Sequence, residues 1–166
     1  MLRARRLAGD DNQWDSMPVI KISPKLDAWI RAEIHKLTVD TRPLEEVLVG
    51  IDTFECLVEA TITDKEHALD LMSVKQVLAQ LRLTRAVELK ADALLAKDLF
   101  DRAVSLGFSG SDDKGAAAAL LSRICLARGR PDLLSDGVEE ALEESRKMDP
   151  AYESLVKRVR QARRIG

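Results

Sequence analysis

The sequence has only two cysteines, Cys56 and Cys125, which lie sixty-nine residues apart. Neither belongs to a Cys-x-x-Cys pair, and no histidines are spaced to complete a metal site. A disulfide framework and a zinc-binding module are therefore excluded. We expect each thiol to be buried as a small apolar side chain in a protein of a reducing compartment.

Long apolar runs are also missing. The longest uninterrupted one spans residues 116–121, whereas a membrane-spanning helix needs roughly 20 apolar residues. The first eight residues carry arginines but no apolar stretch of the signal-peptide kind. We therefore expect a cytoplasmic protein that has no membrane partner.

Aromatic side chains and net charge are both scarce. Two Trp, one Tyr and three Phe leave the packing of a core to Leu, Val, Ile and Ala. The net charge of −2 provides no overall field that would attract nucleic acid. An apolar fraction of 46% beside a charged fraction of 33% is typical of a soluble globular protein rather than a disordered one.

Charge is nevertheless unevenly distributed near the end of the chain. An acidic segment is followed by a basic one, and we expect two neighbouring helices with complementary solvated faces. The acidic residues are Glu139, Glu140, Glu143 and Glu144, and the basic residues are Lys157, Arg158, Arg160, Arg163 and Arg164.

Glycine and proline are absent from residues 51–106. Apolar residues recur there at steps of three and four, the spacing that places side chains on one face of a helix. The step of two from Leu81 to Leu83 rotates that face by roughly 200°, which predicts a break or kink near residues 82–85 with Thr84 as a cap. We expect two helices of about 18 and 23 residues; one long helix also fits if its neighbours differ at its two ends.

Local signals mark the ends of the predicted helices, which cover residues 24–37, 43–60, 64–106, 116–127, 138–148 and 150–162. Gly50 lies inside the second of these and indicates close approach by a neighbour. Gly107 suits a helix C-terminus. The N-terminal signals are Ser23 with Pro24, Thr63 with Glu66, Asp112 or Asp113, Asp136 with Glu139, and Asp149 with Pro150.

These patterns predict an all-α protein built from antiparallel helical hairpins or a bundle of six to seven helices, with one short N-terminal strand or extended arm. We expect a flexible arm at residues 1–16, where Trp14 is a candidate anchor. A strand with the N-terminal helices follows at 17–82, and helical hairpins occupy 83–166. The last two parts are expected to pack as one compact unit, since a chain of 166 residues buries roughly 70% of its unfolded surface.

No motif for catalysis, metal binding or cofactor binding stands out. The glycine-rich stretch 107–115 is not a P-loop, because Gly115 is followed by alanines and no strand precedes the stretch. His67 lies among acidic residues, but on an α-helix it would be turned about 100° from Glu66, so these groups would not converge on a metal. We expect no catalytic, metal or cofactor site and no enzyme activity.

Residues 116–163 resemble a tetratricopeptide-type helical hairpin. The helix 116–127 ending at Gly129 matches the first helix of that family's repeat. Val138, Ala141 and Leu142, followed by Met148-Asp149-Pro150, match the second helix and its terminal proline. A similar pattern precedes them in Ala96, Phe100, Ala103 and Leu106. The resemblance implies stacked hairpins and a protein partner.

Residues 18–59 resemble the ribbon-helix-helix regulators, beginning with a strand-like run from Pro18 to Ser23. That family pairs the strand with its twin in a homodimer and places outward side chains in the DNA major groove. The resemblance implies that Ile20 and Ile22 face inward. The DNA-binding residues that it implies are Val19, Lys21, Ser23 and Lys25.

Two functions are therefore expected from different classes. The first is a non-catalytic protein–protein interaction or assembly module of helical-hairpin type. The alternative is a dimeric DNA-binding regulator or antitoxin of ribbon-helix-helix type, whose helical C-terminal half binds a partner.

Overall fold

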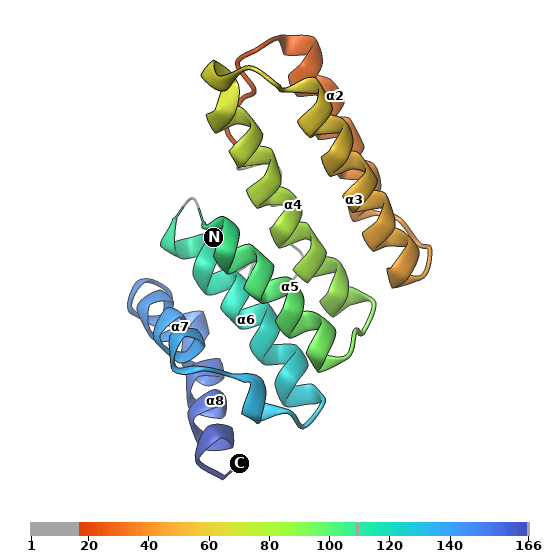
Figure 1. Cartoon of the computed structure of the whole chain (residues 1–166). Coiled ribbons are helices and arrows are strands. Elements are labelled where there is room, and N and C mark those ends of the chain that lie inside the picture. The colour runs from red at the N-terminus through yellow and green to blue at the C-terminus, as the bar shows by residue number, and fades with distance from the viewer. Residues whose placement is uncertain (1–16, 109, 166) are drawn as a thin grey trace.

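The computed structural model describes residues 17–108 and 110–165, and this part holds seven α-helices and no strand (Figure 1). The helices pack as sequential antiparallel pairs, which confirms the predicted all-α class. The expected arm at 1–16, with Trp14, lies outside the described residues. The helices are α2 (Pro24–Thr38), α3 (Leu44–Thr61), α4 (Ala68–Glu88), α5 (Ala93–Leu106), α6 (Ser111–Ala127), α7 (Asp136–Met148) and α8 (Glu153–Ile165).

Two predicted helix starts are confirmed by their hydrogen bonds. The hydroxyl of Ser23 accepts from the backbone N–H of Leu26 at 3.0 Å, with Pro24 as the first helical residue. Asp149 accepts from the N–H of Ala151 at 3.0 Å and opens the short 3-10 turn Pro150–Tyr152 that leads into α8.

Three other predicted starts are wrong. Thr63 and Glu66 form no capping box, because the 3-10 turn Lys65–His67 lies ahead of α4. Helix α6 begins at Ser111 rather than at residue 116, so Asp112 and Asp113 lie in its first turn instead of capping it. Helix α7 is capped one residue before the expected Asp136, since Ser135 accepts from the N–H of Val138 at 3.3 Å.

The expected break at 82–85 is also wrong, because α4 continues to Glu88. The chain turns at Lys90, whose φ of 55° is left-handed, and the N–H of Ala91 donates to the carbonyl of Ala86 at 2.9 Å. Helix α6 ends in the same way with Gly129 at φ 67°. Glycine is the usual residue in this helix-ending motif. Because lysine occupies the position here, the sequence did not indicate where α4 ends.

Lys90→Gly is expected to raise the free energy of unfolding by about 0.5–1 kcal/mol. A non-glycine residue in the left-handed conformation costs about 1–2 kcal/mol, and the substitution removes this cost. Glycine also makes the unfolded chain more flexible, which offsets part of the gain. The Lys90 side chain is exposed, so no buried contact is lost. Thermal denaturation should show a Tm about 2–3 °C higher. Lys114→Gly, inside α6, is the matched control and should lower Tm; a lower Tm for Lys90→Gly would contradict the prediction.

Two hydrophobic clusters share α4. Val74, Leu78 and Leu81 pack in one cluster with α2 and α3, whereas Leu83 and Ala86 pack in the other with α5–α8. The step of two from Leu81 to Leu83 therefore marks two faces of one continuous helix, with different neighbours on each side (Figure 1). The division at residue 82 into two regions stays a prediction.

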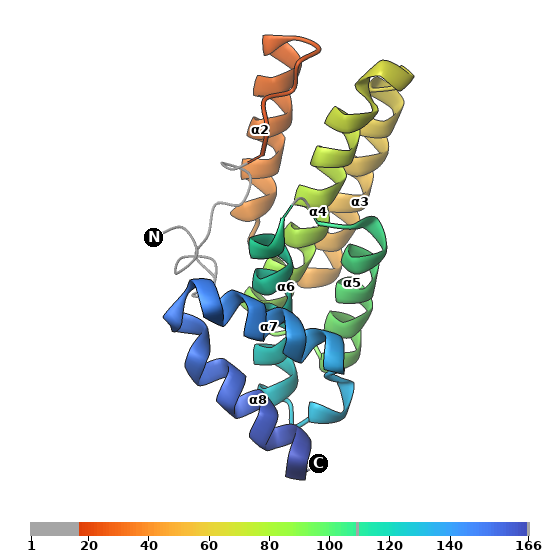
Figure 2. The same ribbon diagram turned by 90° about the vertical axis from the view of Figure 1, so that its left-hand side faces the viewer.

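Residues 78–86 of α4 are all buried, because α2 and α3 cover one side and α5 and α6 the other. Figure 1 shows α4 between the α2–α3 pair and the α5–α6 pair, and Figure 2 shows α7 and α8 at the lower end of the molecule, with α2 and α3 at the upper end. Polar side chains in the buried stretch have specific partners. Arg82 pairs with Asp52 at 2.7 Å and Glu55 at 3.1 Å on α3, and Gln80 donates to the carbonyl of Asp113 at 3.1 Å.

Helix α6 lies very close to α7 at Gly115. A Cβ added there would lie 1.8 Å from the Oγ of Ser145 and 2.9 Å from its Cβ. Real Cβ atoms do not approach other atoms at those distances, so the two helices pack this closely only because residue 115 has no side chain. The glycine therefore belongs to a helix, not to the loop 107–115 expected from the sequence. Gly107, at φ 93°, does end α5 as predicted.

The charged faces of α7 and α8 meet, as predicted. Arg160 pairs with Glu139 at 3.3 Å and with Glu143 at 3.0 Å, while Arg163 reaches Asp136 at 2.5 Å and Glu139 at 2.8 Å. A hydrogen bond from Arg146 on the same helix is the main cause that lowers the pKa of Glu143. Two of the basic residues of the C-terminal segment, Arg160 and Arg163, thus pair with acidic residues of α7.

Residues 17–23 lie as an extended arm against the helices, which is one of the two predicted forms. The N–H of Ile20 donates to Asp27 at 2.9 Å, and the N–H of Lys21 donates to Asp70 at 3.0 Å. Ile20 is buried, as expected, but Ile22 is 36% exposed, so the expectation that it also faces inward is wrong. The arm bends at residues 21–22 and directs Ile22 outward.

The two cysteines differ in their surroundings. Cys125 is buried, as predicted, and burial raises the pKa of its thiol to about 11. Cys56 is exposed on α3, so the prediction that both thiols are buried is wrong for this residue. Within the described residues, no helix has the length and apolar character needed to cross a membrane.

Candidate partner-binding groove

A groove runs between α2 and α3 on the side of α3 that faces away from α4. Asp52 and Glu55 point from α3 toward Arg82 of α4. Val49, Thr53 and Leu57 are spaced four residues apart and form one stripe, and Thr53 is turned about 200° from Glu55. This stripe lines the groove, whose volume is about 770 Å³.

The groove has an apolar floor, and its α3 side carries exposed apolar residues. Leu37 and Phe54 are almost fully buried at its floor, whereas Val49 is 63% exposed and Leu57 is 51% exposed. Trp29 of α2 packs edge-on against Phe54, with ring centroids 5.3 Å apart, and stays 37% exposed. Trp29 therefore covers part of Phe54, although it is not itself among the residues that line the groove.

Gly50 allows the floor to close at one end. A Cβ at this position would lie 3.2 Å from Nη2 of Arg42 and 3.4 Å from Cδ2 of Leu37. The sequence predicted such a close approach from a glycine inside a helix, and the structure confirms it. The neighbours come from the end of α2 and from the connector that leads into α3.

One end of the groove is acidic. The lining of the whole groove includes four carboxylates and two cations, which gives it a net charge of −2. The cations are already paired, Arg42 with Asp40 at 2.6 Å and Lys36 with Glu33 at 2.9 Å. The hydrogen bond from Arg42 lowers the pKa of Asp40 to about 2, so this carboxylate stays ionised.

Glu45 and Glu46 carry the remaining negative charge. Both lie in the first turn of α3, where an acidic side chain is favoured by the positive end of the helix dipole. Neither forms an ion pair with another residue in the described part of the chain. Because the helix end supplies only about half a positive charge, two full negative charges leave this end of the groove acidic.

The candidate DNA-binding residues lie elsewhere, on the extended arm and the first turn of α2. Val19 is 65% exposed, and Lys21 and Lys25 are exposed as well. The hydroxyl of Ser23 is engaged in capping α2 and is half-buried. DNA contact by these residues stays a prediction.

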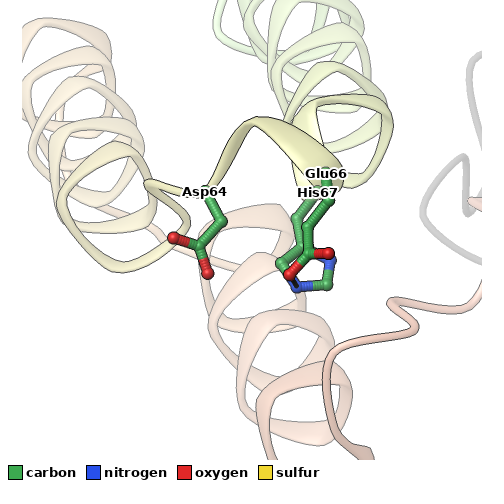
Figure 3. A group of neighbouring side chains, drawn as sticks. All are labelled: Asp64, Glu66 and His67. Atoms are coloured by element: carbon green, nitrogen blue, oxygen red, sulfur yellow. Dashed lines mark ion pairs between the residues drawn. The ribbon is translucent and has the colours of Figure 1, made fainter.

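Asp64, Glu66 and His67 form the one group among the described residues with metal-ligand spacing (Figure 3). One atom from each lies within 4.8 Å of the others, and Nε2 of His67 is 3.5 Å from Oε1 of Glu66. The sequence reasoning assumed an α-helix here, whereas a 3-10 turn brings the side chains together. The group lies on the surface, and the Glu66 side chain is 76% exposed.

A second, smaller pocket lies beside the C-terminal ends of α4 and α6 and has a volume of about 420 Å³. Its basic residues include Lys90 and Arg128. The guanidinium of Arg128 donates to the carbonyls of Lys90 and Ala91 at 2.6 and 3.3 Å, so it completes the turn between α4 and α5. The role of this cation is structural.

The groove and the exposure of Val49 and Leu57 were not predicted from the sequence. The only signal was that apolar residues occur around more of α3 than one neighbouring helix can cover. Which of them remain exposed depends on where α4 packs, and local periodicity does not contain that information.

Comparisons of this chain with protein-family models, curated proteins and solved structures found no match.

Proposed function

We propose that the protein is a non-catalytic protein–protein interaction or assembly module of helical-hairpin type, and that it binds its partner in the α2–α3 groove. The observation that carries the proposal is the pair of exposed apolar side chains, Val49 and Leu57, that flank Thr53 along the groove. Val49 and Leu57 are more than half exposed and lie two turns apart over a buried apolar floor. Single exposed apolar residues are ordinary, whereas a contiguous set over a groove is typical of an interaction site.

The arrangement of the helices supports the same function. Antiparallel hairpins stacked in sequence order leave the first hairpin covered by α4 on one side and open on the other. Tetratricopeptide-like stacks, which the C-terminal half resembles, use open helical surfaces for peptide and protein partners. The groove is lined by both apolar and charged side chains. This combination is suited to binding the amphipathic surface of a partner.

A photo-crosslinking amino acid at Thr53, in the middle of the groove, tests the proposal in native cells. The expected result is a discrete crosslinked protein, identified by mass spectrometry and then purified. Leu57→Asp should weaken binding of that purified partner about tenfold or more, since a charge would replace an apolar contact at the interface.

Leu94→Asp is the matched control, because Leu94 is 60% exposed on α5, outside the groove. It should leave the affinity for the purified partner unchanged. Equal loss of affinity in Leu57→Asp and Leu94→Asp would contradict the assignment of the groove. Circular dichroism of both variants establishes that the helical content is preserved.

A further inference from the structure

We infer that the groove takes an α-helical segment of its partner that carries apolar side chains along one face and basic side chains at the end lying over Glu45 and Glu46. The inference rests on the proposed function and names the chemistry of the partner. It follows from the length of the groove, the spacing of the side chains along α3 and the charge at one end.

The dimensions fit a helix. Glu45 and Leu57 mark the two ends of the groove on α3 and are twelve residues apart, a distance of about 18 Å along a helix axis. A partner helix of about 12 residues, or three to four turns, matches this length. The antiparallel helices α2 and α3 lie side by side, and a third helix can pack into the groove between them.

The apolar stripe sets the spacing of the partner's side chains. Val49, Thr53 and Leu57 follow one another at four-residue intervals, one turn apart. A partner helix lying alongside them presents apolar side chains at intervals of three and four residues, as amphipathic helices do when they bind in grooves. An extended peptide repeats its side chains every two residues and does not match this interval.

Charge complementarity sets the sign of the partner. The cations of the lining are paired with Asp40 and Glu33, so Glu45 and Glu46 carry the net charge of −2, although Arg42 also attracts Glu46. An acidic helix would meet repulsion at this end, whereas lysine or arginine side chains would be attracted and would also steer the encounter. The partner is therefore basic at one end and apolar along one face.

The test uses the whole chain and two synthetic helical peptides of about 14 residues that share the same leucine stripe. One peptide has lysines on its polar face, and the other has glutamates. Fluorescence anisotropy should show the lysine peptide binding about tenfold or more tightly at about 50 mM salt, with the difference shrinking at about 500 mM salt.

Two groove variants separate the charge effect from the apolar one. The double variant Glu45→Lys/Glu46→Lys should reverse the preference, so that the glutamate peptide binds more tightly. The double variant Asp98→Lys/Glu140→Lys makes the same change in net charge at exposed positions on α5 and α7 and should keep the lysine preference. Leu57→Asp should lower the affinity for the lysine peptide about tenfold.

Equal affinities of the two peptides for the wild-type chain would overturn the inference, and so would a preference that Glu45→Lys/Glu46→Lys and the control variant change alike. If the peptides bind equally but both depend on Leu57, the groove still binds helices and the proposed function stands. If neither peptide binds, the inference fails, while the proposed function is decided separately by crosslinking at Thr53.

Discussion

Gly115→Val is expected to lower the free energy of unfolding by about 2–3 kcal/mol, because a side chain at this position overpacks the contact between α6 and α7. Even a Cβ would lie 1.8 Å from Oγ and 2.9 Å from Cβ of Ser145. The hydroxyl can rotate away, but the Cβ moves only if the helices separate. Thermal denaturation should show a Tm lower by about 5–10 °C.

A second helical glycine provides the control for this prediction. Gly137 of α7 has only an ordinary contact, with Oγ of Ser135 3.6 Å from an added Cβ. Gly137→Ala should therefore leave the Tm unchanged or raise it slightly, since alanine favours a helix by up to about 1 kcal/mol. A Tm for Gly115→Val equal to that of Gly137→Ala would show that α6 and α7 do not approach each other at residue 115.

Arg85→Met is expected to lower the free energy of unfolding by about 2–4 kcal/mol, since two partly buried carbonyls would lose their hydrogen-bond donor. The Arg85 side chain is 6% exposed and donates to the carbonyls of Thr38, at 3.0 Å, and of Asp40. Thr38 is the last residue of α2. Methionine keeps an apolar stem of similar length, so the measured loss reports on these two hydrogen bonds together with the ion pair between Arg85 and Glu88 at 3.3 Å.

Urea denaturation followed by circular dichroism gives this loss directly. Arg102→Met on α5, where the side chain is exposed, is the control and should change the stability by no more than about 0.5 kcal/mol. Equal stabilities of the two variants would contradict the structural role of Arg85. Hydrogen exchange should also become faster at the end of α2, because Arg85 connects that end to α4.

Much of the fold was predictable from local patterns. Apolar periodicity located the helices, and Ser23 with Pro24, Gly107, and Asp149 with Pro150 marked ends that the structure confirms. The errors lie where tertiary contacts outweigh local signals. Gly115 resembles a loop residue in the sequence, but its lack of a side chain is what lets α7 approach α6.

The end of α4 and the groove were not predictable for related reasons. Lys90 adopts a left-handed conformation that glycine usually occupies, so the sequence carried no sign of the turn. Leu57 and Val58 are adjacent apolar residues on α3, and only the position of α4 decides that Val58 is buried and Leu57 exposed. A candidate site made from the surface left uncovered by packing requires the packing to be known.

The nine consecutive buried residues 78–86 of α4 couple the two ends of the molecule. Separating α2 and α3 from the rest would expose Leu78 and Leu81, and separating α5–α8 would expose Leu83 and Ala86. Loss of either neighbour leaves apolar surface on the same helix in water. The molecule is therefore expected to unfold cooperatively, and a cut within α4 would leave both fragments prone to aggregate.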